Sequence, residues 1–557
     1  MIVKNCNQCN TGFEVTDEDR KFYERVSPVI GGKKFQIPQP TLCPLCRHQR
    51  RIVWRNERFL YRDKCGLCGK SIITMYPPES KFPIYCPDCF WSDKWDPLDY
   101  GREFDFTRPF FEQFKKLLDE VPQVSIFQGN SINSEYTINS INNKNCYLTS
   151  GADYNEDCLY GINTQRSKDC VDHYLIYDSE LCYGCLDSAR LHNCVGCQES
   201  ENCSDSYFLY DCKNCKHCAF SCNLRNKEYI IFNQQVGKDE YERKLKEALS
   251  SLFKSPTWLF DSLKKVRDIA IHRAALILAS ENCIGDNIRN CKNSQYIFDA
   301  ENIEDCKYCF YALDTKNSYD LSCAGWGSCF LYEVISSAQN NNVLFCSAVI
   351  NVSDAIYCRC DWNSRNIFGS TSLHSQNSYV ILNKQYSKVE YEKLVPKIIE
   401  HIQKTGEWGE FFPPHLSPFE YNRSMAIDYL PVSSEEAQKK GFRWSFEDEK
   451  TQTPATYELP DTISGVPESV INEILSCKNC SKNYRVVSQE LRFHRKIDLP
   501  LPKLCWPCRL KNLIKARKPM KLFESACTKC NAKILTPYLP NTPLKVYCEK
   551  CYLETVY

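Results

Sequence analysis

Residues 144–191 read KNCYLTSGADYN, EDCLYGINTQRS, KDCVDHYLIYDS and ELCYGCLDSARL when the sequence is divided every 12 positions. A cysteine or serine recurs at the third position of each block, at Ser134, Cys146, Cys158, Cys170, Cys182 and Cys194. Small thiol and hydroxyl residues in register at a short period predict a β-solenoid, in which each coil stacks like groups on like groups. The period leaves open whether one coil contains 12 or 24 residues.

A second series of the same kind follows at Ser294, Cys306, Ser318 and Cys329 or Phe330, and more weakly near Ser353, Arg365 and Ser378. The two series end alike, because YIIFNQQVGKDEYE at 229–242 matches YVILNKQYSKVEYE at 379–392, 150 positions later. Each then enters a charged amphipathic stretch, which predicts helices over 240–252 and 389–403. The solenoid is therefore predicted to be duplicated, with these helices as caps.

Eight CxxC pairs lie outside the repeats, four at each end of the chain. From the second pair onward, each C-terminal cysteine lies 462 positions after its N-terminal counterpart, which indicates an internal duplication. Two CxxC pairs supply four thiolates, which complete a tetrahedral Zn²⁺ site with no open position. Such a site is typical of structural zinc. The predicted sites, for four Zn²⁺ ions, are Cys6, Cys9, Cys43 and Cys46; Cys65, Cys68, Cys86 and Cys89; Cys477, Cys480, Cys505 and Cys508; and Cys527, Cys530, Cys548 and Cys551.

These ends resemble the treble-clef "probable zinc-ribbon" domain family. The resemblance rests on Cys6-Cys9-Phe13, on the acidic residues before Phe22-Tyr23, and on PTLCPLCR at 40–47. The C-terminal copy keeps the pattern, except that Trp506 replaces the proline between the paired cysteines. The whole chain is similar to uncharacterised cysteine-rich zinc-binding proteins of candidate-phylum bacteria and giant viruses. The resemblance implies zinc and a fold, but no reaction.

The composition of the chain limits the classes of protein to which it can belong. It has 557 residues, 37 of them cysteine, and a formal charge of +1. The N-terminus lacks the layout of a secretory signal, and no apolar run reaches the roughly 18 residues of a membrane helix, so a cytoplasmic, reducing location without membrane contact is expected. In that location thiols bind metal more readily than they form disulfides.

The residues after Cys46 contain no Gly or Pro and are predicted to continue as a helix to Cys65. Residues 43–64 hold seven Lys or Arg against two acids, and residues 503–521 hold seven against none. A basic helix on a zinc knuckle suits contact with RNA or DNA phosphates. The candidate contacts are Arg47, Arg51, Arg55, Arg58, Arg62, Lys511, Lys515 and Lys518. Residues 131–222 hold 13 acids and 6 bases, so the basic helices can alternatively dock on the acidic middle of the chain.

One further cysteine group is a possible extra metal site. Cys212, Cys215, Cys218 and Cys222 have the spacing of bacterial ferredoxin ligands, although Asn223 stands where proline is expected. The alternative is that these cysteines face inward as small apolar residues, which makes an Fe–S cluster the less favoured interpretation. Cys182, Cys185, Cys194 and Cys197 offer a similar, weaker zinc possibility.

Known catalytic patterns are missing from the sequence. It contains no HExxH, no phosphate-binding glycine loop and no open zinc triad. Asp153, Glu156, Asp157 and Asp172 could supply paired carboxylates for sugar hydrolysis, but acids on a repeat surface are usually solvated. The chain is therefore predicted not to be an enzyme.

The predicted fold is mainly β, with small α/β zinc modules around a duplicated β-solenoid. The predicted boundaries are a tandem zinc module at 1–98, a capping helix and linker at 99–122, solenoid halves at 123–237 and 282–387, a helical insertion at 238–281, a capping helix at 388–405, an irregular strap at 406–470, and a second tandem zinc module at 471–557. The predicted function is a structural zinc scaffold that contacts nucleic acid through its basic helices. The alternatives are a protein-interaction platform whose solenoid faces bind partners, or a metal or Fe–S enzyme.

Overall fold

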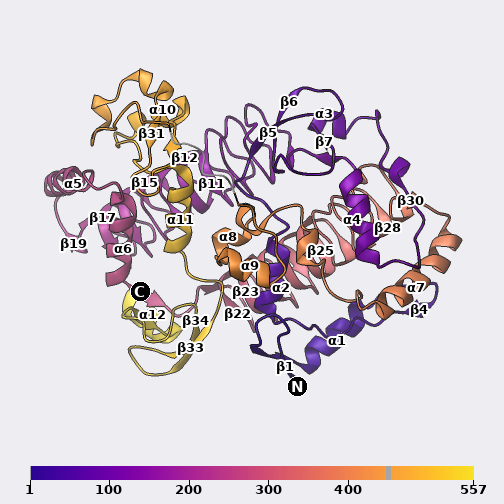
Figure 1. Cartoon of the computed structure of the whole chain (residues 1–557). Coiled ribbons are helices and arrows are strands. Elements are labelled where there is room, and N and C mark those ends of the chain that lie inside the picture. The colour runs from indigo at the N-terminus through magenta and orange to yellow at the C-terminus, as the bar shows by residue number, and fades with distance from the viewer. Residues whose placement is uncertain (1, 447–452) are drawn as a thin grey trace. The chain divides into compact units, whose positions relative to one another are not determined.

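The computed structural model describes residues 2–446 and 453–557 and divides into two compact units. Unit 1 comprises Met1–Ile126 and Ala275–Ser445, and unit 2 comprises Phe127–Ala274 and Phe446–Tyr557. The fold is mainly β with cysteine-rich modules (Figure 1). Each unit combines one end of the chain with the more distant half of the repeats: the N-terminal module shares unit 1 with the second series, and the C-terminal module shares unit 2 with the first.

The elements of unit 1 begin with the N-terminal module and resume at the second repeat series. Its strands are β1 (Ile2–Asn5), β2 (Gly12–Val15), β3 (Val29–Ile30), β4 (Lys33–Lys34), β5 (Tyr61–Lys64), β6 (Ser71–Thr74), β7 (Ile84–Tyr85), β8 (Gln123–Val124), β21 (Ile277–Leu278), β22 (Ile284–Arg289), β23 (Gln295–Glu301), β24 (Lys307–Lys316), β25 (Tyr319–Ala338), β26 (Asn341–Leu344), β27 (Ser353–Ile356), β28 (Arg365–Phe368), β29 (Ser378–Ile381) and β30 (Lys384–Gln385). Its helices are α1 (Asp17–Val26), α2 (Pro44–Ile52), α3 (Pro87–Phe90), α4 (Phe110–Glu120), α7 (Lys388–Lys404), α8 (Ala426–Tyr429) and α9 (Ser434–Lys439), with 3-10 turns η1 (Pro97–Tyr100), η2 (Pro414–Leu416) and η3 (Tyr421–Arg423).

The elements of unit 2 begin with the first repeat series and end with the C-terminal module. Its strands are β9 (Gln128–Gly129), β10 (Ser140–Ile141), β11 (Leu159–Ile162), β12 (Lys168–Tyr177), β13 (Glu180–Tyr183), β14 (Leu186–Ala189), β15 (His192–Val195), β16 (Ser204–Tyr210), β17 (Lys216–Cys222), β18 (Glu228–Ile231), β19 (Gln234–Gln235), β20 (Ile271–Arg273), β31 (Leu475–Ser476), β32 (Asn483–Tyr484), β33 (Phe523–Ala526), β34 (Lys533–Thr536) and β35 (Lys545–Tyr547). Its helices are α5 (Lys238–Leu252), α6 (Trp258–Ile269), α10 (Ser488–Lys496), α11 (Trp506–Ala516) and α12 (Glu549–Val556), with 3-10 turns η4 (Ile463–Gly465) and η5 (Glu468–Asn472). Residues 447–452 of the predicted strap lie outside the described residues.

Each unit contains one large mixed sheet, which we call its ladder. The ladder of unit 2 has nine strands, β11–β19, and that of unit 1 has ten, β21–β30. All their pairs are parallel except the last, β18–β19 and β29–β30. Cys170 pairs with Cys182, and Cys194 with Ser206, so neighbouring strands are 12 residues apart and not 24.

The backbone of the ladders turns at every third residue. In one coil Asn145, Leu148, Tyr154 and Asp157 all have φ between 51° and 59°, and Gly151 has φ 59°. This left-handed conformation is tolerated best by Gly, Asn and Asp, which explains why Asn and Asp are so frequent in the repeats.

Thiols and hydroxyls fill the interior of the unit 2 ladder. Cys146, Cys158, Cys170, Cys182 and Cys194 belong to one buried cluster. Their sulfurs approach backbone carbonyls, as in Cys158 Sγ to Ser167 O at 3.4 Å. A serine in the same column plays the same part, since Ser134 Oγ donates to the Ile132 carbonyl at 2.9 Å, and it also accepts a hydrogen bond from the Cys146 amide at 3.0 Å. These cysteines therefore act as small buried residues with weak donors.

Charged side chains alternate in sign along one outer column of the same ladder. Lys144 lies 2.8 Å from Glu156, and Glu156 lies 3.4 Å from Lys168. These exposed pairs add little stability individually, but a pairing that skipped one coil would place Lys144 opposite Lys168, and like charges directly opposite each other are destabilising. The column therefore favours the observed pairing over its alternatives.

A core of aromatic and aliphatic side chains joins the ladder of unit 1 to its helices. Phe110 and Phe114 of α4, Ile381 of β29 and Val395 of α7 belong to one buried cluster. The predicted helices at 240–252 and 389–403 are confirmed as α5 and α7, with ends shifted by at most two residues, and the segment 99–122 contains the predicted helix as α4. No helix in residues 2–446 and 453–557 combines the length and apolar character required to cross a membrane.

Cutting the chain between residues 274 and 275 is expected to leave the two fragments associated. The core of unit 1 takes Phe110 from the first fragment and Val395 from the second, so neither fragment can complete that unit alone. Fragments 1–274 and 275–557, co-expressed with a tag on one, should co-purify. Two separately expressed fragments that each unfold cooperatively would contradict this expectation.

An Asp361→Asn variant is expected to be more stable than the parent at alkaline pH. Burial raises the pKa of Asp361 to about 7 from 3.8, so the folded state holds its proton more tightly than the unfolded state. Stability therefore falls as pH rises from about 4 to 7, and the asparagine abolishes this loss of about 1–3 kcal/mol. Asparagine can accept the same hydrogen bond from the Leu373 amide, as Asn340 does from Val352 at 2.8 Å.

Urea unfolding at pH 5 and pH 8 measures this difference. The Asp354→Asn change, at an exposed position of the same ladder, is the matched control for the loss of one carboxylate. Parallel pH profiles for Asp361→Asn and the parent would show that Asp361 does not hold its proton.

Candidate metal centres

The same local structure builds all four cysteine clusters. The first CxxC pair lies in the turn of a two-stranded hairpin, β1–β2, β5–β6, β31–β32 or β33–β34. The second pair starts a helix, so that Cys43, Cys86, Cys505 and Cys548 are the N-caps of α2, α3, α11 and α12. The positive end of each helix therefore faces sulfur atoms, which favours thiolates there.

The four sulfurs of every cluster lie within 4.8 Å of one another, and each cluster could hold a metal ion. Four of the sulfur pairs are separated by 3.7 Å (Cys9–Cys43), 4.0 Å (Cys68–Cys86), 3.6 Å (Cys480–Cys505) and 3.7 Å (Cys530–Cys548). A tetrahedral ion with metal–sulfur bonds of about 2.3 Å requires sulfurs about 3.8 Å apart. The observed spacing matches this requirement. The structure thus brings together all sixteen cysteines selected from the sequence.

Backbone amides favour the metal-binding form of these thiols. Burial raises the pKa of Cys65, but hydrogen bonds from the backbone around Cys68 and Cys86 outweigh it, and the pKa falls to about 6. The same balance lowers the pKa of Cys527 to about 6 and that of Cys477 to about 7. The lowered pKa of the first cysteine in three clusters favours the thiolate, which is the form that binds metal.

The helix that follows the first cluster is shorter than the sequence suggests. α2 ends at Ile52, and Tyr61–Lys64 forms the strand β5. The Asn56 side chain accepts hydrogen bonds from the amides of Arg58 (3.1 Å) and Phe59 (2.9 Å) and so fixes a turn. β5 then leads into the hairpin that carries Cys65. The prediction that the residues after Cys46 continue as a helix to Cys65 is therefore wrong.

The arginines of α2 are directed into unit 1. Arg47 makes a two-pronged contact with Asp320, with both nitrogen–oxygen distances at 2.9 Å, and only 1% of the residue is exposed. Arg51 is fully buried and contacts Glu333 at 3.0 Å. Arg50, which the sequence did not select, joins Glu333 (2.9 Å) to Glu410 (2.8 Å). These buried ion pairs attach the metal module to the ladder.

The C-terminal module attaches to the ladder of unit 2 in the same manner. Arg509, 462 positions after Arg47, contacts Asp172 at 2.6 Å and Glu490 at 3.0 Å. Its guanidinium lies 4.4 Å from the ring centre of Tyr160. Asp172 and Asp320 occupy matching places in the two repeat series, 148 positions apart. Each lies two positions after a repeat residue, Cys170 or Ser318, and this shared step was a signal in the sequence that could have identified both acidic partners.

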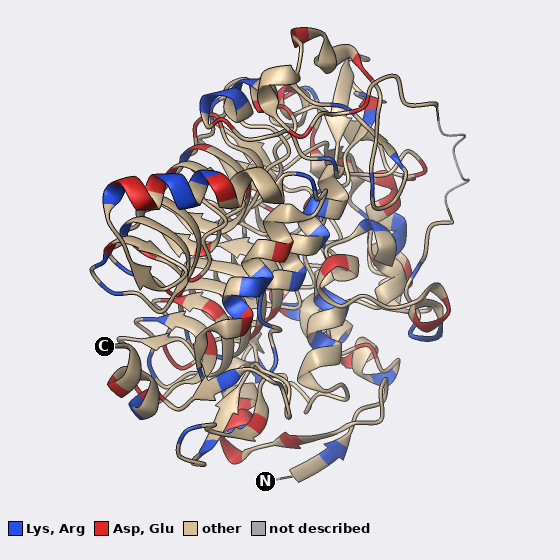
Figure 2. Ribbon diagram, turned by 90° about the vertical axis from the view of Figure 1, so that its left-hand side faces the viewer, with Lys and Arg blue, Asp and Glu red and all other residues tan. Residues whose placement is uncertain are grey.

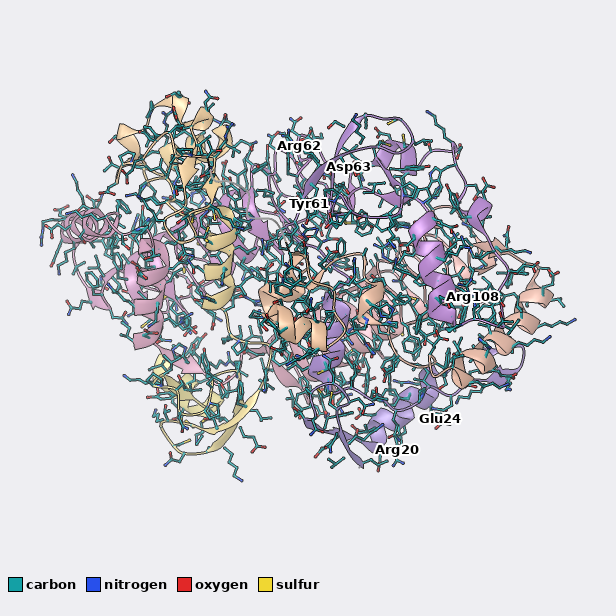
Figure 3. The ribbon with its side chains drawn as sticks, in the orientation of Figure 1. Arg20, Glu24, Tyr61, Arg62, Asp63 and Arg108 are labelled. Carbon is teal, nitrogen blue, oxygen red and sulfur yellow. The ribbon has the colours of Figure 1, made fainter. Side chains whose placement is uncertain are left out.

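The remaining candidate nucleic-acid contacts are divided between paired and exposed positions. Arg55 is 8% exposed and pairs with Glu57 at 2.9 Å, and Arg58 pairs with Asp428 at 2.8 Å. Lys518 lies 3.3 Å from Glu199. Arg62 is exposed on β5 beside Asp63 (Figure 3), and Lys511 and Lys515 are exposed on α11. Acidic and basic residues are interspersed along the ribbon in Figure 2.

The expectation that the arginines in and just after α2 contact phosphates is thus corrected for the three that are buried. Arg47, Arg51 and Arg55 are buried against carboxylates of their own unit, and a buried guanidinium is not accessible to a nucleic-acid backbone. The alternative, docking on the acidic stretch 131–222, describes α11, whereas α2 docks on acids of the second repeat series, outside that stretch. Asp320 and Glu333 of the second series receive α2, and Asp172 of the first receives α11.

The ferredoxin-like cysteines do not form a comparable cluster. Among the described residues, only the four groups above bring three or more His, Cys, Asp or Glu ligand atoms within 4.8 Å. Cys212 and Cys218 instead approach the carbonyls of Tyr210 (3.5 Å) and Lys216 (3.3 Å) within the ladder. Cys215 does the same with Lys213 at 3.3 Å, and Cys222 is buried in β17. Cys182, Cys185, Cys194 and Cys197 are buried in the same interior.

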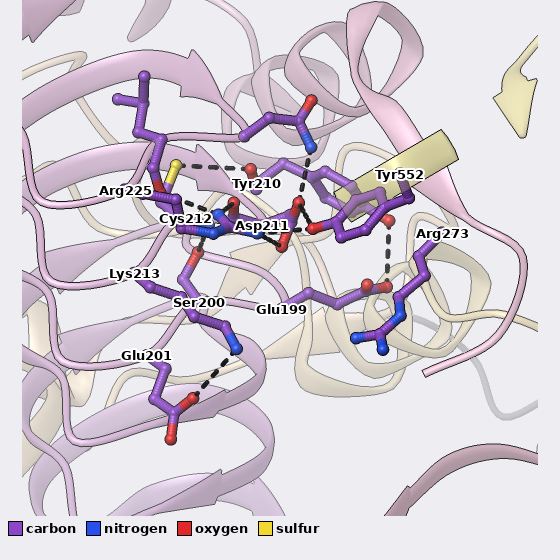
Figure 4. Close-up of polar contacts among 12 residues, drawn as sticks. Glu199, Ser200, Glu201, Tyr210, Asp211, Cys212, Lys213, Arg225, Arg273 and Tyr552 are labelled. Atoms are coloured by element: carbon purple, nitrogen blue, oxygen red, sulfur yellow. Dashed lines mark hydrogen bonds and ion pairs between the residues drawn. The ribbon is translucent and has the colours of Figure 1, made fainter. Parts of the chain in front are cut away.

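The acids considered for hydrolysis have structural partners. Asp172 pairs with Arg509, and Glu156 belongs to the alternating charge column. A separate network fastens α12 to the ladder (Figure 4), where the Tyr552 hydroxyl donates to Asp211 Oδ2 at 2.5 Å and Arg225 pairs with Asp211 at 2.9 Å. Tyr210 in the same view donates to Glu199 at 3.1 Å. These groups hold the second C-terminal cluster in place.

Comparisons with known proteins add little information beyond this geometry. No family model and no curated protein matches the chain. Among solved structures, a crystal structure of a proposed acetyltransferase from Desulfovibrio desulfuricans G20 aligns with 11% identity and a TM-score of 0.11. That alignment spans 41% of this chain and 63% of the other. A similarity at this TM-score carries no argument about fold or activity, so the function must be inferred from the clusters and their surroundings.

Proposed function

We propose that this protein is a zinc-dependent structural scaffold. In this proposal four Cys₄ sites each hold one Zn²⁺ ion, and the two ladders are β-solenoids with 12-residue coils. The observation that carries it is the compactness of the clusters, whose sulfurs all lie within 4.8 Å of one another. Four thiolates around one ion leave no position for substrate, which is typical of structural zinc. The treble-clef resemblance of both ends supports the same choice of metal.

The proposed ions would hold together short segments that have only a small hydrophobic core of their own. In the first cluster Cys6 and Cys9 come from a hairpin, and Cys43 and Cys46 come from the start of α2. Fixing α2 to the hairpin orients Arg47 and Arg51 toward their carboxylate partners. Metal binding and docking on the ladder would therefore be coupled, because ligands and arginines share one short helix.

We do not propose nucleic-acid binding as the function. Three of the five candidate arginines are buried, so the basic charge of α2 serves internal attachment. The protein-interaction platform is the second candidate. It is favoured by an apolar surface at the end of the unit 2 ladder, where Phe232 is 54% exposed.

Elemental analysis of the purified protein tests the metal proposal. We expect four zinc ions per chain, one for each cluster, and no visible absorption band. Release of the zinc by a thiol-modifying mercurial should be complete and should be accompanied by loss of the native near-ultraviolet circular dichroism. Iron in place of zinc, or protein that is folded and free of metal, would refute the proposal.

A further inference from the structure

The second cluster of each metal module lies beside the segment by which the chain leaves its unit. We call the site of Cys65, Cys68, Cys86 and Cys89 cluster 2 and that of Cys527, Cys530, Cys548 and Cys551 cluster 4. In unit 1, β7 leads directly into a ligand of cluster 2 and pairs in parallel with β8, close to the boundary at Ile126. In unit 2, β35 leads directly into a ligand of cluster 4 and pairs in parallel with β20, next to the boundary at Ala274. Both segments are therefore held by a strand that ends at a cluster.

The contacts around β35 fix the departing segment of unit 2, residues 271–274. The Ala274 amide donates to the Tyr547 carbonyl at 2.8 Å, and Arg273 forms an ion pair with Glu549. Tyr547 and Glu549 are the sequence neighbours of the ligand Cys548. Removal of the metal would release Cys548 and loosen the contacts on both sides of it, because a metal site of this kind stabilises the local fold. The hold on residues 271–274 therefore depends on cluster 4.

Cluster 4 is more exposed to solvent than cluster 2. Cys530 and Cys68, which occupy matching positions, are both exposed. Cys548, however, is half-buried, whereas its counterpart Cys86 is only 1% exposed. In all three other clusters the cysteine that caps the helix is buried. Cluster 4 therefore presents two ligands to solvent, and each of the other clusters presents one.

Two lysines flank the sulfurs of cluster 4. Lys529 and Lys550 each stand just before the second cysteine of a CxxC pair, and both are exposed. Cluster 2 has Leu67 and Asp88 at the matching positions, 462 residues earlier. Four thiolates around one Zn²⁺ ion carry a net charge of about −2, which repels anionic reagents unless nearby cations offset it. The lysines offset this charge at cluster 4, whereas at cluster 2 Asp88 is paired with Lys70 and leaves it unchanged.

We propose that cluster 4 is a redox-sensitive clamp, which a small anionic disulfide such as oxidised glutathione opens by oxidising Cys530 and Cys548. The two sulfurs are 3.7 Å apart, and they belong to the two ligands of the cluster that solvent reaches. Opening frees residues 271–274, so the oxidant controls the segment by which the chain leaves unit 2. The inference deepens the proposed scaffold function and rests on the metal sites of that proposal.

The reaction consumes one disulfide molecule for each cluster. The Cys530 thiolate attacks one sulfur of the reagent, which forms a mixed disulfide and releases the other half of the reagent as a thiolate. The Cys548 thiolate then attacks the Cys530 sulfur, which forms a disulfide between the two cysteines and releases the second half of the reagent as a thiolate. The two cysteines lose two electrons and the reagent gains two. Only Cys527 and Cys551 remain as ligands, and two thiolates are too few for a structural zinc site.

The test adds oxidised glutathione to the full-length protein after its zinc content has been measured. One zinc ion per chain should be released at least about tenfold faster than the others, since the access of the reagent to the thiolate controls such exchange. Peptide mass spectrometry should then find a disulfide within cluster 4, and limited trypsin digestion should cleave after Arg273 only in the oxidised protein. Release of all ions at one rate, or the same digestion before and after oxidation, would overturn the inference. Protein that contains no zinc before oxidation would instead refute the proposed function.

The double variant Lys529→Leu/Lys550→Asp tests the role of the charge. It introduces the residues of cluster 2, where the same local structure forms, and it should slow zinc release by oxidised glutathione about tenfold at low ionic strength. Lys511→Leu/Lys515→Asp makes the same change of charge at exposed positions of α11 and is the matched control, which should react like the parent. Neutral bis(2-hydroxyethyl) disulfide should oxidise the parent and Lys529→Leu/Lys550→Asp at similar rates. If oxidised glutathione also did so, the lysines would not select an anionic reagent and the inference would fail.

Discussion

A Cys505→Ser variant is expected to lose one of four metal ions and to release α11 from the ladder of unit 2. Cys505 is both a cluster ligand and the N-cap of α11, and its amide donates to Cys477 Sγ at 3.3 Å. Arg509, one turn further along, carries the ion pairs with Asp172 and Glu490. Loss of a structural zinc site costs up to about 10 kcal/mol, so we expect the C-terminal module to unfold locally.

Metal analysis and hydrogen exchange measure the two effects. The metal content should fall from four to three per chain, and the amides of α11 should exchange much faster than those of the ladder. Cys194→Ser is the control, because Cys194 is a buried cysteine of the ladder interior whose column neighbour is Ser206. That variant should retain four ions. If both variants behaved alike, the cluster would not be the metal site that we propose.

An Arg47→Met variant is expected to destabilise unit 1 by about 3–5 kcal/mol. The change leaves Asp320 and Glu333, both fully buried, with one positive partner fewer, and a buried charge without its partner is costly. Arg51 remains, but at 3.4 Å from Asp320 it makes the weaker contact. Urea unfolding of the metal-loaded protein measures the effect as a change in the free energy of unfolding.

Adding Asp320→Asn to Arg47→Met should recover part of the loss. Asparagine removes the buried charge and suits the backbone at this position, where φ is 57°. Arg62→Met, at the exposed candidate on β5, is the matched control and should change stability by less than about 0.5 kcal/mol. Equal effects of Arg47→Met and Arg62→Met would mean that the buried ion pairs do not attach α2.

Much of the local structure was predictable because it depends on near neighbours in the sequence. The 12-residue period appears directly in the pairing of Cys170 with Cys182. The CxxC pairs predicted both the cysteines and their grouping, because each site combines two consecutive CxxC pairs. Helices such as α7 were found from their amphipathic pattern, which reflects one buried face. The end of α2 was missed, because the turn at Asn56 depends on the hairpin that follows.

The role of the basic residues could not be predicted in this way. The sequence shows that Arg47 and Arg51 are positive and lie on one helix, which fits a phosphate surface and an internal ion pair equally well. Their partner Asp320 lies 273 residues from Arg47. Sequence patterns report periodicity and charge, whereas the choice between solvent and a buried carboxylate depends on which surfaces meet after folding.

The sequence by itself determined the duplication, the four cysteine clusters, the 12-residue period and the two helices that follow the repeats, because all of these follow from spacing along the chain. The strand pairing then decided that one coil contains 12 residues and not 24. Only the tertiary structure decided that the N-terminal module belongs with the second repeat series and the C-terminal module with the first. It also decided that Leu382 is buried while Phe232 is exposed. The physical reason is that burial and ion pairing are set by long-range packing between complementary surfaces. Such packing produces no periodic pattern in the sequence of either segment.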